Sequence, residues 1–181
     1  MSDFVVCPDP DDARLTTRVT GTDHDGNSIQ TSVTVERPLT LYVNSQEVVT
    51  LMTVGDHVES LAVGYLINQS MLKSSDEITG VEYDEEIDTV VVRTAVETDF
   101  EDRLKKRTRT SGCALGTVFG DLMERFEEVT LNPDARIRTS WLYSLSKTIN
   151  TMPSLYLKAG AIHGCVLCAQ DRAMIYMEDV G

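Results

Sequence analysis

The chain has 181 residues, of which 41% are hydrophobic and 25% charged, as in one or two small globular domains and unlike a disordered chain. Sixteen basic and 29 acidic residues give a net charge of −13, which argues against nucleic-acid binding and against an acidic membrane surface as partner. The longest nearly apolar run, residues 61–67, is far shorter than the roughly 20 residues of a membrane span. The N-terminus lacks the basic start and cleavage site of a secretory signal, so we expect a cytoplasmic protein.

The first part of the chain predicts a polar lead followed by a small sheet. Residues 1–30 are polar and weakly patterned, and we expect a lead segment with a turn at 23–27. Period-two alternation of apolar residues then begins. It predicts strands at 33–35, 39–43 and 46–51, with a tight turn at Asn44-Ser45.

A helix is predicted next. Asp56 is a favoured N-cap residue, and Glu59 follows three positions later, as in a capping box. Apolar residues at helical spacing form one stripe: Val58, Leu61, Ala62, Tyr65 and Leu66. Two short strands at 78–83 and 89–94 complete a small β-rich subdomain with one helix at residues 31–97.

The composition changes after residue 97. Five of the sixteen basic residues lie between Arg103 and Arg109, and the stretch has no apolar period, so we predict a basic mobile loop at 98–112. Helical spacing of apolar residues predicts a helix from Cys113 to about Val129. A second helix capped by Thr139-Ser140 and buried strands at 161–169 and 173–178 follow. We expect residues 113–181 to form an α/β domain truncated after its last strand.

Cys113 is the main candidate for chemistry among the four cysteines, for which no disulfide scaffold is expected. It lies at the predicted start of a helix, where free N–H groups and the positive dipole end stabilise a thiolate. The basic run upstream acts in the same direction. The alternative is that Cys113 is a small core residue, and that the basic run is a solvated surface rather than an anion site. The residues alone leave these alternatives open.

The other candidates lie near the C-terminus. Cys165 and Cys168 have the gap of metal and redox pairs, but residues three apart in a strand face opposite sides, so we interpret both as core and expect no metal site. His163, at a loop-to-strand junction, is either a ligand contact or acid–base group or a structural histidine. Glu178-Asp179 ends the last strand, where ligands often bind in α/β sheets; exposed carboxylates are the alternative.

Five segments carry a family resemblance: residues 36–44, 61–66, 111–113, 160–163 and 178–181. In this order and spacing they resemble the formate dehydrogenase accessory sulfurtransferase family (FdhD), from about residue 33 to the end of the chain. The resemblance implies a carrier that takes persulfide sulfur from a cysteine desulfurase. It passes the sulfur to the molybdenum (or tungsten) bis-pterin guanine dinucleotide cofactor of formate dehydrogenase.

The resemblance also assigns residues and fold. Cys113 matches the persulfide-bearing cysteine, and His163, Gly160 and Asp179 are candidate cofactor-binding residues. The catalytic domain is expected to be similar to cytidine deaminases and to form homodimers. Many members have a second cysteine three residues after the first, where this chain has Gly116, and the family continues past the segment that ends this chain.

We therefore predict a mixed α/β protein: a small N-terminal sheet with one helix, then an incomplete cytidine-deaminase-like domain. The leading interpretation is sulfur transfer in the maturation of formate dehydrogenase. One alternative is a non-catalytic chaperone that binds the cofactor or the dehydrogenase, an interpretation that Gly116 keeps open. A metal-binding module built on Cys165 and Cys168 is the third interpretation.

Overall fold

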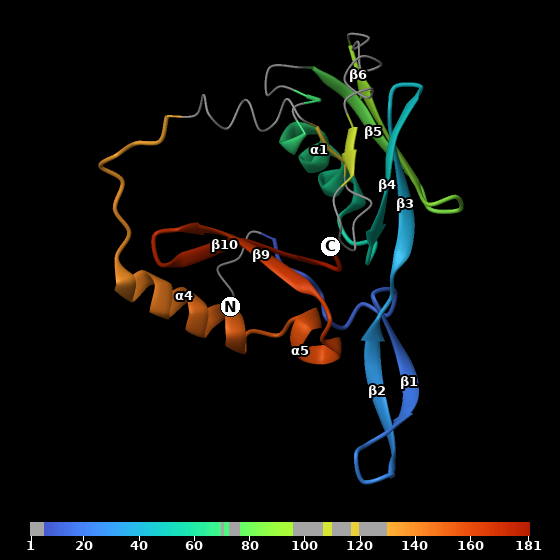
Figure 1. Cartoon of the computed structure of the whole chain (residues 1–181), viewed down its shortest axis with the longest axis vertical. Coiled ribbons are helices and arrows are strands. Elements are labelled where there is room, and N and C mark those ends of the chain that lie inside the picture. The colour runs from blue at the N-terminus through green and yellow to red at the C-terminus, as the bar shows by residue number, and fades with distance from the viewer. Residues whose placement is uncertain (1–5, 70, 73–76, 96–106, 110–116, 120–129) are drawn as a thin grey trace. The chain divides into compact units, whose positions relative to one another are not determined.

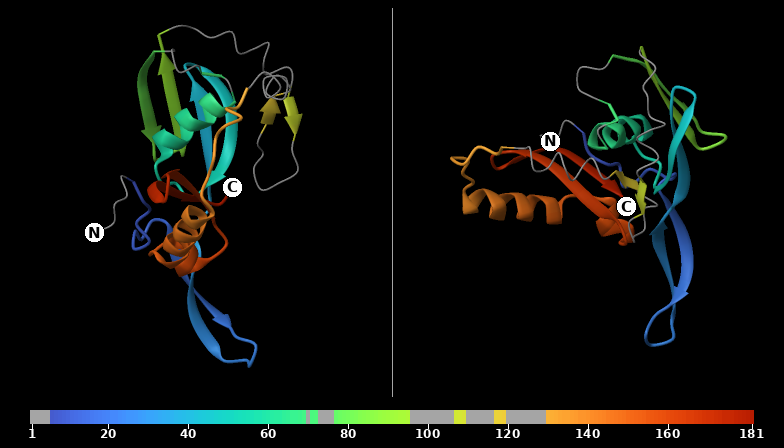
Figure 2. Two further views of the ribbon diagram at one scale, coloured as in Figure 1. Left: turned by 90° about the vertical axis from the view of Figure 1, so that its left-hand side faces the viewer. Right: turned by 45° about the horizontal axis from the view of Figure 1, so that its top comes forward.

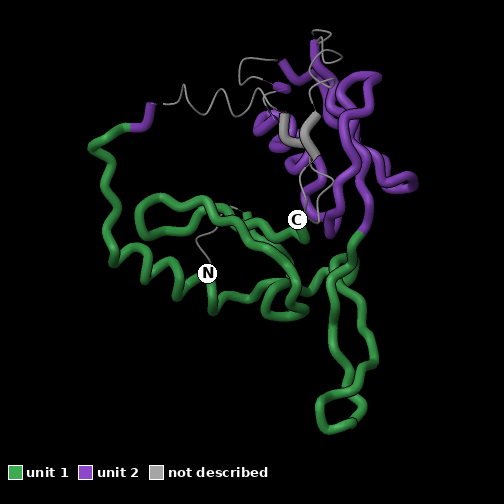
Figure 3. Tube along the Cα trace, viewed as in Figure 1, with its two compact units in different colours: residues 1–36, 132–181 green, residues 37–131 purple. Residues whose placement is uncertain are grey.

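The structure is a computed structural model that describes residues 6–69, 71–72, 77–95, 107–109, 117–119 and 130–181. The chain divides into two compact units (Figure 3), residues 1–36 with 132–181 and residues 37–131. The described part contains both helices and strands, which confirms the mixed α/β class. None of the helices in these ranges is long and apolar enough to cross a membrane.

The unit of residues 37–131 is built on a four-stranded sheet (Figure 1). Its strands are β3 (Arg37–Val43), β4 (Gln46–Thr53), β5 (Ile78–Asp84) and β6 (Thr89–Thr94), in the order β4-β3-β6-β5. The central strands β3 and β6 are parallel, and each pairs with its antiparallel hairpin partner. The predicted strands are confirmed, and the tight turn at Asn44 has the positive φ of 53° that suits asparagine.

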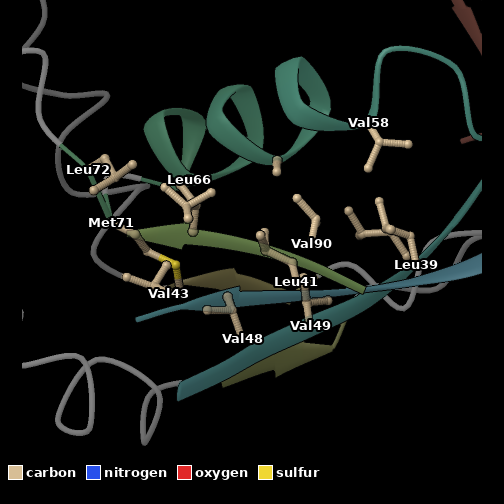
Figure 4. Packing of buried hydrophobic residues seen from close by; sticks show 13 residues of the cluster. Leu39, Leu41, Val43, Val48, Val49, Val58, Leu66, Met71, Leu72 and Val90 are labelled. Carbon is tan, nitrogen blue, oxygen red and sulfur yellow. The ribbon is translucent and has the colours of Figure 1, made fainter. Parts of the chain in front are cut away.

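Helix α1 (Val58–Asn68) lies across one face of this sheet (Figure 2). Alternate residues of β3 point towards it, and Val58 and Leu66 point back towards the sheet (Figure 4). Ala62, about one helical turn from each of them, is buried as well. The core formed between them contains Leu39, Leu41, Val43, Val48, Val49, Leu51, Val58, Ala62, Leu66, Met71, Leu72, Val90 and Val92. The predicted apolar stripe of the helix is therefore confirmed.

The predicted capping box at the start of α1 is wrong. The N-cap residue is His57, whose φ of 48° is left-handed, and no side chain caps the helix. The Asp56 carboxylate lies 3.7 Å from Nε2 of His57. Gly55 has a φ of 81°, and a Cβ atom at this position would lie 3.1 Å from Nε of Arg37. The chain therefore turns twice before it becomes helical, and Asp56 lies one residue too early to serve as the cap.

In the other unit, β1 (Thr16–Thr22) and β2 (Ser28–Thr34) form an antiparallel hairpin (Figure 1). Much of it lies in the segment expected to be an unstructured lead, so that expectation is wrong for residues 16–30. Both strands are rich in threonine, which favours extended backbone. The turn between them was predicted; there the Asp23 carboxylate accepts hydrogen bonds from the backbone of Asp25 and Asn27 at 2.9 and 2.8 Å.

The remaining elements of this unit are α4 (Thr139–Thr151), α5 (Leu155–Ala159), β9 (His163–Ala169) and β10 (Arg172–Asp179). Strands β9 and β10 form the predicted hairpin, and α4 lies beside β10 (Figure 1). The predicted Thr139-Ser140 cap is wrong, because the N-cap is Arg138 and no side chain caps the helix. The Arg138 guanidinium instead lies 5.4 Å from the ring centroid of Trp141.

Two short strands lie where a loop and a helix were expected. Strand β7 (Arg107–Arg109) pairs antiparallel with β8 (Thr117–Phe119). The predicted continuous helix from Cys113 to Val129 is therefore wrong at 117–119, where β-favouring residues find a backbone partner. The segment 98–112 that we predicted to be mobile includes β7; its other residues, and Cys113 and Gly116, lie outside the described ranges.

Candidate functional site

The candidate residues Gly160 and His163 lie where α5 leads into β9. Gly160 ends α5, and its N–H donates to the carbonyl oxygen of Tyr156 at 2.9 Å. Its φ of 65° and ψ of −169° suit glycine. Ala161 follows with a φ of 51°, and β9 begins at His163. The chain therefore makes a sharp, conformationally restricted turn directly before the candidate histidine.

The β-hairpin brings Asp179 beside this turn. Asp179 is the register partner of His163 across the two antiparallel strands. His163 is exposed, whereas Asp179 is half-buried and its Oδ1 accepts a hydrogen bond from the Val180 N–H at 2.7 Å. The structure thus brings together Gly160, His163 and Asp179, which lie up to 19 positions apart in the sequence. An imidazole and a carboxylate at one end of a hairpin can exchange hydrogen bonds with a polar ligand.

Glu178 is directed differently from its neighbour Asp179. It is only 6% exposed. Its Oε2 accepts from the Leu155 N–H at 2.7 Å, and its Oε1 accepts from the Tyr156 N–H at 3.1 Å and from the Tyr176 hydroxyl at 2.8 Å. The interpretation of both C-terminal carboxylates as exposed is therefore wrong for Glu178, which binds the start of α5.

Ser154 completes the capping of α5. As the N-cap residue, it accepts a hydrogen bond from the Leu157 N–H on its side-chain oxygen at 3.2 Å. Together with Glu178, it satisfies three of the N–H groups that the start of a helix leaves unpaired. The negative charge of Glu178 also complements the positive end of the helix dipole. A glutamate on the inward face of an apolar strand, two residues after Tyr176, is the sequence signal for this cluster, and we missed it.

Burial raises the pKa of Tyr176 well above its usual range, and the hydrogen bond to the Glu178 carboxylate raises it further. With its pKa raised, the phenol stays protonated well into the alkaline range, so its hydroxyl remains a donor there. The buried contact between the two side chains therefore joins a neutral donor to a carboxylate acceptor.

The two cysteines of β9 lie on opposite faces, as predicted. Cys165 shares the exposed face with His163 and Leu167, and Cys168 is half-buried on the other side. The interpretation of Cys165 as a core residue is wrong, because this face of β9 is open: Leu167 is 60% exposed. Within the ranges that the structure describes, no group of three or more His, Cys, Asp or Glu side chains is placed to hold a metal ion.

The chain is similar in sequence to a known family of proteins. The sequence profile described as the FdhD/NarQ family matches residues 34–181. The chain is 26% identical over 162 residues to the sulfur carrier protein FdhD of Listeria innocua, covering 84% of this chain and 60% of that protein. It is 24% identical over 156 residues to the protein of the same name from Bacillus subtilis, covering 86% and 60%. The chain thus spans about three-fifths of the length of these relatives.

The fold also has a counterpart among solved structures. A crystal structure from Desulfotalea psychrophila, described as that of a candidate formate dehydrogenase accessory protein, superposes with a TM-score of 0.63. It is 17% identical in sequence, and the match covers 92% of this chain and 62% of that one. The similarity at this identity shows a shared fold.

Proposed function

This chain belongs to the FdhD/NarQ family, and on that premise we propose that it is a sulfur carrier in the maturation of formate dehydrogenase. The observation that carries the proposal is the extent of the family match. Residues 34–181 include all five of the segments on which the resemblance was based, Cys113 among them. The relatives named sulfur carrier protein FdhD support the same function.

In the proposed reaction, Cys113 carries the sulfur. Its thiolate attacks the terminal sulfur of a persulfide on a cysteine desulfurase. The sulfur–sulfur bond of the donor breaks, the donor cysteine leaves as a thiolate, and Cys113 becomes the persulfide. The sulfur–sulfur bond of the Cys113 persulfide then breaks as its terminal sulfur passes to the acceptor cofactor. Two electrons from the reduced acceptor convert that sulfur to sulfide, and Cys113 is released as the thiolate. One cysteine suffices for these steps, so Gly116 in place of a second cysteine is compatible with them.

The substrate that accepts the sulfur is the molybdenum (or tungsten) bis-pterin guanine dinucleotide cofactor. We propose that His163, Gly160 and Asp179 contact it. The exposed imidazole and the adjacent carboxylate support this role, because a carboxylate accepts hydrogen bonds from the N–H groups of guanine. The five basic residues between Arg103 and Arg109 would attract the phosphates in a chain that is otherwise acidic.

We propose further that residues 113–181 belong to a cytidine-deaminase-like domain, after a β-rich subdomain at 31–97 and a loop at 98–112. The partners in this proposal are a cysteine desulfurase, formate dehydrogenase and a second copy of the chain, in the cytoplasm. The solved relative shares the fold of this chain, which supports the mixed α/β architecture of this proposal.

Mass spectrometry after incubation with a cysteine desulfurase and cysteine tests the carrier role. The parent chain should gain one sulfur, located on the peptide that contains Cys113. Cys113→Ser should lose this gain. Cys165→Ser is the matched control, because Cys165 is an exposed thiol that is expected to play no part. Sulfur gain by Cys113→Ser equal to that of the parent would refute the carrier role of Cys113.

The non-catalytic chaperone is the alternative that this experiment separates. A chaperone would bind the cofactor or the dehydrogenase but would gain no sulfur at Cys113. In the complete protein, Cys113→Ser should then still support full maturation of formate dehydrogenase. Loss of maturation without loss of fold in that variant favours the sulfur carrier.

A further inference from the structure

We propose that Glu178 is a positioning residue that sets the turn at Gly160–His163, a role that rests on the proposed function of that turn in cofactor binding. Its carboxylate links β10 to the start of α5. The bound N–H groups belong to Tyr156 and Leu155, which precede Glu178 by 22 and 23 positions in the sequence. Glu178 itself is buried and faces away from Asp179, so it acts through α5 rather than by touching the cofactor.

Helix α5 depends on such contacts for its position. It has five residues, Leu155–Ala159, and isolated helices this short are not stable in water. One end is held by Ser154 and the two oxygens of Glu178. Towards its other end, Lys158 donates hydrogen bonds to the Pro10 carbonyl oxygen and to the Asp11 carboxylate. Pro10 is half-buried and the Asp11 side chain is exposed. Glu178 is thus the buried charged attachment of α5, beside the packing of the fully buried Leu155 and the contacts of α5 with β2.

The position of α5 determines the position of the turn. Gly160 and Ala161 both have positive φ, and β9 is already paired with β10 at His163. The three residues between α5 and β9 therefore have little freedom to compensate for a displacement of the helix. A shift of α5 away from β10 would move Gly160 and change the surroundings of His163.

Glu178→Gln keeps the size of the side chain but removes its charge and one acceptor oxygen, so it separates these two contributions from packing. A carboxylate offers two acceptor oxygens, and Glu178 uses both on backbone N–H groups. The amide of glutamine has the same shape but only one acceptor, so its NH₂ group would face an N–H donor. Tyr176→Phe is the milder variant, because it removes only the hydroxyl that donates to Oε1.

The test compares Glu178→Gln and Tyr176→Phe with the parent and with Glu82→Gln, which removes an exposed ion pair to Arg93 in the other unit. Hydrogen exchange measures the exchange rates of the Leu155 and Tyr156 amides, and NMR measures the resonances of the His163 imidazole. Binding of GDP serves as the probe for the guanine nucleotide contact. Each variant is measured at a temperature well below the midpoint of its own thermal unfolding.

We expect Glu178→Gln to accelerate exchange at Leu155 and Tyr156 at least tenfold, to shift the His163 resonances and to weaken GDP binding at least fivefold. Tyr176→Phe should show the same changes to a smaller extent, and Glu82→Gln none. Unchanged His163 resonances and unchanged GDP affinity in Glu178→Gln, despite faster exchange, would show a merely structural role and overturn the proposal.

Failure of the proposed function has a different signature. A parent chain that neither binds GDP nor gains sulfur at Cys113 contradicts the proposed function. In that case the His163 resonances alone test the positioning role of Glu178. A shift in Glu178→Gln that is absent in Glu82→Gln supports it, and no shift in either variant refutes it.

Discussion

The ring of Tyr176 crosses Gly164 of the neighbouring strand so closely that a Cβ atom at position 164 would lie 2.8 Å from Cε2 of Tyr176 and 2.9 Å from its hydroxyl oxygen. The register partner of Gly164 across the hairpin is Glu178, so the ring crosses the hairpin diagonally. Glycine at this position leaves room for the ring and lets the hydroxyl reach the Glu178 carboxylate. The close approach of a side chain, and not the backbone conformation, thus explains the glycine.

Replacement of this glycine should therefore be costly. We expect Gly164→Ala to lower the free energy of unfolding by about 1–3 kcal/mol, the usual effect of overpacking a well-packed site. Gly80→Ala is the control, because nothing lies within 4 Å of a Cβ at that position in β5. Urea unfolding measures both variants. Equal stability of Gly164→Ala and the parent would show that the Tyr176 ring can move aside without loss.

The turn before β9 contains a residue under backbone strain. Ala161 has a φ of 51°, a left-handed conformation that costs a non-glycine residue about 1–2 kcal/mol. Ala161→Gly should remove this strain but add up to about 1 kcal/mol of entropy to the unfolded chain. We expect a net rise in the free energy of unfolding of a few tenths to about 1 kcal/mol.

The same substitution at a regular strand position provides the control. Ala169→Gly lies at the end of β9, where φ is not positive, and should lower stability by roughly 0.5–1 kcal/mol. Thermal unfolding followed by circular dichroism compares the two. Destabilisation of similar size by both variants would contradict the strain at Ala161.

Alkaline pH should weaken the contact between Tyr176 and Glu178. The pKa of Tyr176 is raised in the folded chain above the value of about 10 for an unfolded tyrosine. The stabilisation linked to its proton is therefore fully present below pH 10 and is lost as the pH rises through the folded pKa. The free energy of unfolding should fall from about pH 10 upwards, and Tyr176→Phe should reduce that slope. Tyr143→Phe, at a 75% exposed position, should retain the slope of the parent.

Thiol labelling should separate the cysteines of β9. We expect iodoacetamide to modify Cys165 in the native chain faster than Cys168, because Cys165 is exposed and Cys168 is half-buried on the opposite face. Peptide mapping after timed labelling measures both. Equal rates at the two residues would contradict the assignment of faces. The exposed Cys165 also means that reaction of a native thiol does not by itself identify Cys113.

Much of the fold could be predicted from local patterns. Alternation predicted the strands at 39–43 and 46–51, and short strands were predicted at 78–83 and 89–94. Apolar residues at helical spacing predicted the buried side of α1. The same reasoning assigned Cys165 and Cys168 to opposite faces of β9. These patterns suffice because the pleat of a strand and the pitch of a helix fix which side chains share a face.

Other features depended on contacts that a local pattern does not contain. Asp56 and Thr139 are good capping residues by type, but the path of the chain into each helix makes His57 and Arg138 the caps. Apolar spacing around residues 117–119 suited a helix, yet these residues pair with Arg107–Arg109 as a strand. In each case a partner or a chain direction set elsewhere overrode local propensity.

The family, the small sheet with its helix and the faces of β9 follow from the sequence alone. Tertiary structure decided which of those faces is covered: Cys165 lies open, whereas Glu178 is buried against α5. It also placed His163 opposite Asp179. The physical reason is that periodicity encodes the direction of a side chain relative to its own strand or helix. Burial and hydrogen bonding depend on what the rest of the chain brings to that side.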